Sequence, residues 1–214
     1  MNAETKKWRR KLKLASEHVF YEMEMFAAPL ADSGRFARTF RRNVSSSSGT
    51  EETELDGNAL LESFLLHART LWDFFSSEPN EQILGVKAKR RSNRRARTAR
   101  KGDIVAAHFI YLSPPNAKPA YPIIRLLPQR IINRLNRDLA HITAQRRAGR
   151  DWNPADFTPV VEASMEFLAS IPLRYQNEAW RKAQNMVRQG HQNLVEIIVS
   201  KKSATTGTTV SLPI

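Results

Sequence analysis

The 214 residues include no cysteine. Disulfide bonds, thiolate catalysis and cysteine-ligated zinc are therefore excluded in this sequence. Long apolar runs are missing as well, because no stretch approaches the roughly 18 residues that a membrane-spanning helix requires. The first residues also lack the apolar core of a secretion signal. We therefore expect a cytoplasmic protein that does not enter a membrane.

Motifs for catalysis and ligand binding are equally scarce. The sequence has no GxxxxGK[ST] or GxGxxG phosphate-binding loop and no GxSxG nucleophile turn. Its histidines form neither an HxH nor an HExxH pattern, so we predict no metal site and no cofactor. The five histidines are His18, His67, His108, His141 and His191.

Positive charge is what the sequence has in excess. The formal net charge is +13 and the isoelectric point is near 10.5, which makes a polyanion the first partner to consider. Nine bases without an acid lie in residues 87–101, and removing these nine charges from +13 leaves +4. They are Lys87, Lys89, Arg90, Arg91, Arg94, Arg95, Arg97, Arg100 and Lys101.

This basic tract, residues 87–101, has two interpretations. As a nucleic-acid arm it would bind phosphates in a salt-dependent and largely sequence-independent way, without base stacking because it holds no aromatic residue. As an ordinary surface element it would be a mobile, solvated loop. The density of charge favours the first interpretation. A membrane-surface role is less favoured, since no apolar anchor adjoins the tract.

Apolar periodicity predicts an all-α protein, a bundle of about five helices with no convincing sheet. We expect one domain over residues 1–190, with a flexible acidic loop at 43–57 and the basic tract as an arm. Residues 191–214 form a tail; LVEIIVS within it is typical of a strand, and the last dozen residues look disordered. The expected helices span about 4–28, 58–76, 103–109, 128–147, 158–170 and 173–189.

Two of these helices carry recognisable faces. The helix at 58–76 has the clearest core stripe, with His67 at its border as a structural residue and with Arg69 and Asp73 spaced to pair. The helix at 4–28 begins with six bases, for which a solvated face is the ordinary interpretation and contact with anions the alternative. These bases are Lys6, Lys7, Arg9, Arg10, Lys11 and Lys13.

The helix at 128–147 contains the main catalytic candidates. On a helical projection, its apolar residues occupy one stripe, while Arg134, Arg137, Asp138 and His141 share a separate polar stripe. Imidazole transfers protons near neutral pH, arginine stabilises phosphate charge, and a nearby carboxylate orients the imidazole. For RNA the nucleophile can be the substrate's own 2′-hydroxyl, without a metal. A solvated helix face explains the same spacing.

The arginine, short spacer and histidine on a late helix resemble the HEPN superfamily, many of whose members are metal-independent RNases of toxin and defence systems. The strings NALLESFLLHARTLWDFF and INRLNRDLAHITAQR are also similar to those of uncharacterised bacterial HEPN-like proteins. The family pattern is an arginine, usually followed by a polar residue, and then a histidine after a short spacer. Arg137 is followed by polar Asp138 and is separated from His141 by three residues. Arg134 is followed by Leu135 and is separated from His141 by six residues. Both arginines therefore stay candidates.

The resemblance implies a homodimer in which His141 and Arg137 or Arg134 of both copies line a shared cleft. The leading hypothesis is then a metal-independent endoribonuclease of a bacterial toxin or defence system, with His141 as general acid and base. In that hypothesis the basic tract captures RNA. The alternative is a non-catalytic nucleic-acid-binding or regulatory helical protein, whose polar stripe is a surface or a dimer contact.

Overall fold

The protein is a helical bundle, as the sequence predicts. A computed structural model describes residues 3–32, 34–36, 51–78, 97–98, 103–111, 127–140 and 152–206. Within them, five helices have twelve or more residues: α1 (Ala3–Ala31), α3 (Glu51–Ser76), α5 (Gln129–Ala140), α6 (Thr158–Ser170) and α7 (Glu178–Thr206). The shorter elements are α4 (Ala106–Tyr111), β1 (Ser77–Glu78), β2 (Arg97–Thr98) and the 3-10 turns η2 (Pro154–Phe157) and η3 (Leu173–Tyr175).

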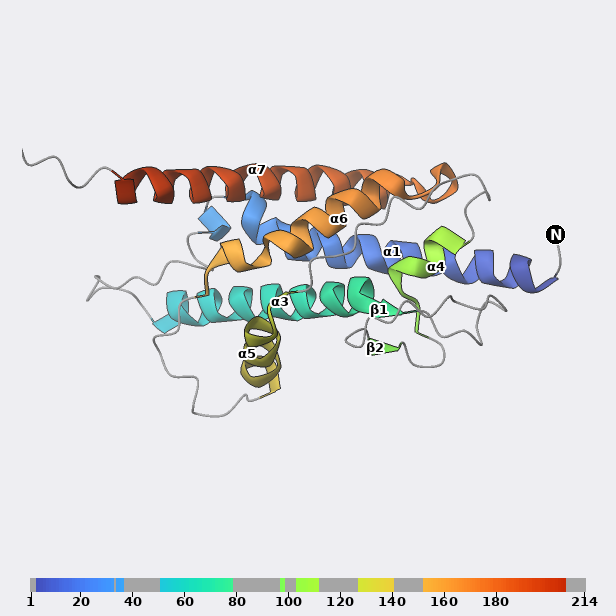
Figure 1. The fold of residues 1–214 in the computed structure, drawn as a ribbon, viewed down its shortest axis with the longest axis horizontal. Helices are drawn as coiled ribbons and strands as arrows, with labels where there is room; N and C mark the ends of the chain where they lie inside the picture. Colours follow the sequence, from blue (N-terminus) through green and yellow to red (C-terminus); the bar gives the residue numbers. More distant parts are fainter. Residues whose placement is uncertain are drawn as a thin grey trace, which may run out of the picture.

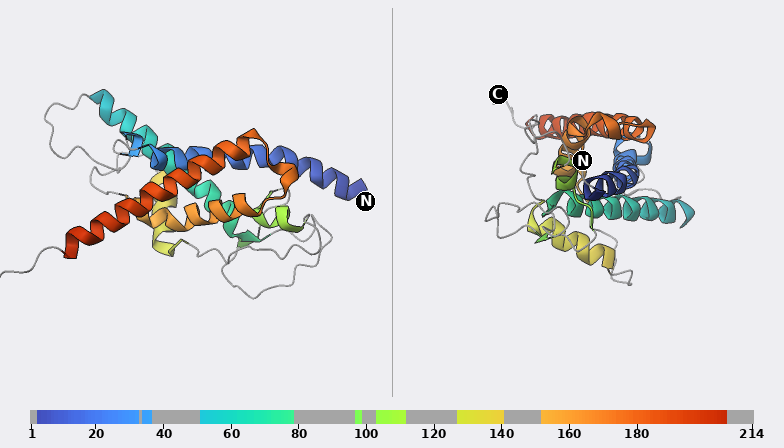
Figure 2. Two further views of the ribbon diagram at one scale, coloured as in Figure 1. Left: turned by 90° about the horizontal axis from the view of Figure 1, so that it is seen from above. Right: turned by 90° about the vertical axis from the view of Figure 1, so that its right-hand side faces the viewer.

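The helices stack in layers (Figures 1 and 2). Helix α7 covers α1 and α6, these two lie on α3, and α5 packs across the opposite side of α3. Helices α1 and α3 are antiparallel, since Glu22 meets His67 while Phe26 further along α1 meets Phe64 earlier on α3. The first turns of α1 project beyond the start of α7 at one end of the bundle, where α4 and β1 also lie.

Aromatic rings fill the core between these layers. Phe167 of α6 lies 5.3 Å from Phe74 of α3 and 5.3 Å from Phe109 of α4, measured between ring centroids in edge-to-face geometry. Phe109 in turn lies 5.6 Å from Tyr175 of η3. Edge-to-face pairs add stabilisation to that of apolar burial. The cluster therefore ties the short helix α4 to three other elements.

Helix α1 continues through Pro29 to Ala31, so the predicted end at Ala28 is wrong. Proline lacks the N–H for an intrahelical bond, and a helix normally ends near it. Here a contact from α7 compensates, because the Asn193 side-chain amide donates to the carbonyls of Leu30 and Ala31 at 2.9 and 3.0 Å. These are carbonyls that a helix end leaves without an intrahelical partner.

The predicted strand and tail after Gly190 are wrong up to Thr206, because α7 is continuous over these residues. The buried residues of α7 recur at helical spacing: Ala183, Val187, Gly190 and Leu194. Gly190 lies in the interface, where a Cβ would stand 3.1 Å from the Leu30 Cβ. The glycine therefore permits close packing on α1 instead of ending the helix.

Other predicted boundaries also shift. Residues 51–57 of the expected acidic loop belong to α3, whereas 43–50 lie outside the described residues. Helix α4 begins at Ala106, three residues after the predicted start at Asp103. The helix expected from 173 divides into η3 and α7, whose first turn is capped where Trp180 N–H donates to Asn177 Oδ1 at 2.9 Å. The bounds of α6 agree with the prediction.

Candidate nucleic-acid interface

Helix α5 holds three of the four predicted catalytic residues, but His141 lies outside the described residues. The apolar stripe of α5 is confirmed, since Ile131, Ile132 and Leu135 are buried against α3. Arg137 is exposed, Arg134 is half-buried, and Asp138 follows Arg137 within the helix. The described residues therefore position the two guanidiniums but do not test the histidine.

Arg134 has a defined contact of its own. Its guanidinium carbon lies 3.8 Å from the centroid of the Trp152 ring, and Trp152 is buried against Phe157. Such cation–π contacts stabilise both groups by about 0.5 to 2 kcal/mol, depending on burial. Arg134 is thus held in place by packing, which suits either a structural residue or a fixed phosphate ligand.

A polar contact also joins α5 to α3. The Arg69 Nε donates to Asn136 Oδ1 at 2.9 Å, and the Arg69 Nη1 lies 2.7 Å from Asp73 Oδ1. The predicted pairing of Arg69 with Asp73 is confirmed. Arg69 also lies over the ring of Trp72, at 4.6 Å. These contacts attach α5 to α3.

Of the basic tract, the structure describes only β2, Arg97–Thr98. This strand pairs in parallel with β1, so that Ser77 aligns with Arg97 and Glu78 with Thr98. Because β1 follows α3 directly, the pairing places this part of the tract at the end of the bundle where α3 ends. The other predicted binding residues of the tract lie outside the described residues: Lys87, Lys89, Arg90, Arg91, Arg94, Arg95, Arg100 and Lys101.

The basic start of α1 lies at the same end of the bundle (Figure 1). Residues 6–13 carry six bases and no acid, and all but the half-buried Arg9 are exposed. A shallow hollow between them is lined by Lys6, Lys7, Arg10, Lys11 and Leu14. We call α1 residues 6–13 together with β2 the basic end. The acids of these elements close to it along the chain are Glu4 in α1 and Glu78 in β1, Asp103 before α4 is exposed, and the bases outnumber these acids.

Behind the basic end lies a histidine that the sequence analysis did not single out. His108 is fully buried, and its ring stacks on Trp8 at 5.9 Å with 22° between the planes. Its Nδ1 accepts the backbone N–H of Val105 at 2.9 Å. The Nε2 therefore carries the proton, and among the described residues it has no hydrogen-bond partner. Burial lowers the pKa of His108 below its ordinary value of 6.5, so the ring is neutral at physiological pH.

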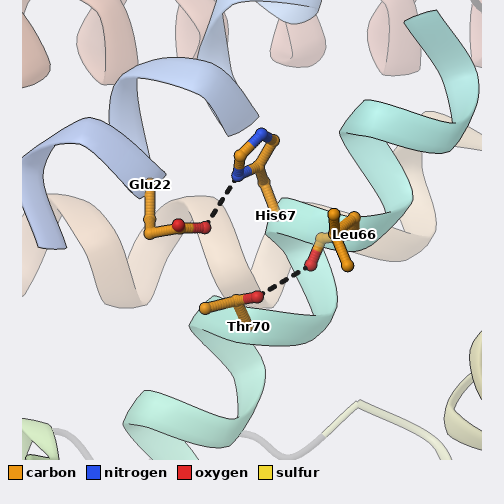
Figure 3. A network of polar contacts seen from close by, with 4 residues as sticks. All are labelled: Glu22, Leu66, His67 and Thr70. Atoms are coloured by element: carbon orange, nitrogen blue, oxygen red, sulfur yellow. Dashed lines mark hydrogen bonds and ion pairs between the residues drawn. The ribbon is translucent and has the colours of Figure 1, made fainter. Parts of the chain in front are cut away.

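His67 has the structural role that its position predicts (Figure 3). Its Nδ1 lies 2.7 Å from Glu22 Oε2, and the Tyr21 ring meets it edge-on at 6.0 Å. Figure 3 shows the pair between α1 and α3, with Thr70 Oγ1 donating to the Leu66 carbonyl one turn along. The pair links α1 to α3, which is a structural role and not a catalytic one.

Within the described ranges, no helix is long and apolar enough to cross a membrane. No group of three or more acids and histidines in the same ranges is placed to hold a metal ion. Comparison with known proteins matches no family model, no curated protein and no solved structure.

Proposed function

We propose that this protein binds RNA, or another nucleic acid, through the basic end, without catalysis. The observation that carries the proposal is the coincidence of two basic segments far apart in sequence. Residues 6–13 of α1 project from the bundle where β2, inside the basic tract, pairs with β1. The neighbouring bases Arg95 and Arg100 are each two residues from β2 along the chain.

The chemistry of this end fits a phosphate backbone. Bases concentrated on one end create a local positive potential that attracts polyanions and accelerates their association. Exposed lysines and arginines neutralise phosphates and release counterions, which makes binding weaken steeply with salt. No acid lies among residues 6–13 to compete with phosphates for these bases, and the nearest acids along the chain are Glu4 and Glu17.

The test is RNA binding measured by fluorescence anisotropy at several salt concentrations, with EDTA present. The variant Lys6→Gln/Lys7→Gln/Arg10→Gln removes three exposed charges of the basic end. For a single strand we expect the slope of log affinity against log salt to fall in magnitude by about 2, because each contact contributes about 0.7.

The matched control removes three exposed charges of α7, as Arg181→Gln/Lys182→Gln/Arg188→Gln. Both variants have the same net charge, so only the position of the lost charges differs. A control slope equal to that of the wild-type protein supports the basic end as the binding surface. Equal losses in both variants, or no RNA binding by the wild type, would overturn the proposal.

A second candidate is the metal-independent endoribonuclease. The observation in its favour is that Trp152 holds the Arg134 guanidinium at 3.8 Å, one helical turn from exposed Arg137, on the helix that leads to His141. With the HEPN-like resemblance, this activity implies a homodimer, with His141 of each copy as general acid and base. Asp138 would orient the imidazole.

The test of this candidate is cleavage of a pool of single-stranded and structured RNAs in EDTA. His141→Ala is compared with His18→Ala, which removes an exposed histidine of α1. Both variants must keep the wild-type circular dichroism and RNA affinity. Loss of cleavage in His141→Ala alone supports the nuclease, and a molar mass of two chains in solution supports the dimer. Wild-type protein that binds RNA without cutting it leaves the non-catalytic function.

A further inference from the structure

The basic end contains one aromatic residue among its bases. Trp8 is the single aromatic side chain in α1 residues 6–13, and its ring is half-buried. The buried imidazole of His108 stacks against the ring, and the Nζ of the exposed Lys11 lies over it, 5.0 Å from its centroid. The ring is therefore in contact with a buried imidazole and with the ammonium of one exposed lysine.

We infer that the Trp8 ring stacks on a nucleobase of single-stranded nucleic acid, while the lysines and arginines around it bind the flanking phosphates. This inference rests on the function proposed above and specifies its ligand. Proteins that bind single strands combine a positive surface, which follows the backbone, with aromatic rings that accept any base. The basic tract has no aromatic residue, so Trp8 supplies what that tract lacks.

The support behind Trp8 favours stacking. His108 is held by the Val105 N–H at 2.9 Å on α4, and α4 is fixed to the core through Phe109. A ring already in its bound position loses little conformational freedom when a base arrives, which strengthens binding. Because His108 is neutral at physiological pH, no charge is buried behind the ring.

The contact with Lys11 does not prevent stacking. An exposed cation–π contact favours its bound form by about two- to fivefold. Stacking of a base on an aromatic side chain is worth about 5- to 150-fold in affinity. The nucleobase therefore displaces the Lys11 side chain from the Trp8 ring, and the Lys11 ammonium is then available to a phosphate. The shallow hollow that Lys11 lines with Lys6, Lys7 and Arg10 offers further cations beside it.

This arrangement selects single strands over other polyanions. In a duplex the bases are stacked on each other and paired, so their faces are not available to Trp8. A membrane surface would instead require an apolar face to insert. In α1 the face next to Trp8 is buried at Leu12, and Leu14 is the single exposed large apolar residue among 6–16.

The experiment measures tryptophan fluorescence and anisotropy with a twelve-residue oligouridylate and with a duplex RNA of equal charge, in EDTA at pH 7.5. Trp8→Leu is compared with Trp8→Phe, which retains an aromatic face. The control is Trp180→Phe, since the Trp180 indole donates to the Leu168 carbonyl within the bundle at 3.0 Å. All variants are first checked for wild-type circular dichroism and thermal unfolding.

We expect the oligouridylate to quench the fluorescence of the wild type and of Trp180→Phe, but not of Trp8→Leu. Trp8→Leu should weaken binding of the single strand by about tenfold or more, with an unchanged salt slope and unchanged duplex affinity. Trp8→Phe should retain most of the wild-type affinity for the single strand. A structural role alone would not separate single strand from duplex.

Two results would overturn the inference in distinguishable ways. If Trp8→Leu binds both RNAs as the wild type does, stacking is wrong while phosphate binding by the basic end stands. If the wild type binds neither RNA, the stacking inference and the proposed function both fail. Vesicles containing phosphatidylserine, bound more tightly than either RNA, would likewise overturn both.

Discussion

Glu22 of α1 and His67 of α3 form a hydrogen-bonded pair, with 2.7 Å between Oε2 and Nδ1. Their side chains are 26% and 11% exposed, so the pair is only partly accessible to solvent. It lies between antiparallel helices that also make apolar contacts, such as Phe26 on Phe64. A directional contact of this kind fixes the register of two helices that apolar packing alone fixes less well.

Replacing Glu22 by Gln should lower the free energy of unfolding by about 1 to 2 kcal/mol. A hydrogen bond to a charged group contributes about that much, and the change leaves a poorer partner for His67. Urea unfolding at pH 7 measures the loss, with Glu17→Gln on the exposed face of α1 as control. In a double-mutant cycle, His67→Ala should cost little more once Glu22 is already replaced; full additivity would contradict the pairing.

His108 should make the fold less stable in acid. Burial lowers its pKa below 6.5, so the unfolded chain binds a proton more readily than the folded one. Its stabilising contribution is therefore complete above about pH 6.5 and decreases as the pH falls below it, by at most about 1.4 kcal/mol per pH unit. Protonation at Nδ1 would also remove the acceptor of the Val105 N–H.

The variant His108→Asn tests this effect, because an amide oxygen can accept the Val105 N–H but does not titrate. We expect it to be less stable than the wild type at pH 7.5, since it loses the stack with Trp8. Between pH 7 and pH 5, however, its Tm should fall less than that of the wild type. Parallel curves for the two proteins would show that His108 is not the titrating group.

Gly190 should tolerate no branched side chain. A Cβ there would lie 3.1 Å from the Leu30 Cβ and 3.4 Å from the Ala27 carbonyl oxygen, and a backbone atom cannot move aside cheaply. Gly190→Val should lower the free energy of unfolding by about 1 to 3 kcal/mol, the usual cost of overpacking. Gln192→Val, exposed on the same helix, is the control for helix propensity. Equal thermal stability of the two variants would exclude close packing as the reason for the glycine.

Local patterns predicted the elements whose environment lies in their own sequence. The apolar stripe of α3 contains Phe64 and Leu71, and the periodicity of α6 begins at a proline that its first turn accepts; both elements have the predicted character. Continuation of α7 past Gly190 depends on contact with α1, some 160 residues away, and the extension of α1 past Pro29 depends on contact with α7. The spacing of residues within one helix cannot predict either of these two continuations.

The candidate site also combines features that the sequence predicts with features that depend on tertiary contacts. The charge of residues 6–13 and 87–101 is visible in the sequence, but the position of Arg97–Thr98 at one end of the bundle depends on the pairing of β1 with β2, which have two residues each. The stack of Trp8 on His108 joins residues 100 positions apart, and an isolated histidine in a short helix gives no signal of it. The placement of Arg134 on Trp152 is tertiary for the same reason.

Phe167 should support the basic end from the interior. Its ring contacts Phe74 and Phe109 at 5.3 Å each, so its removal leaves a cavity beneath α4. Phe167→Ala should lower the free energy of unfolding by about 3 to 5 kcal/mol, whereas Glu166→Ala, exposed one residue earlier, should change it little. Under conditions where Phe167→Ala is still folded, the loosened α4 should also increase the solvent exposure of Trp8. Acrylamide quenching of tryptophan fluorescence measures that exposure, and a loss of stability below about 1 kcal/mol would contradict a central place for this ring.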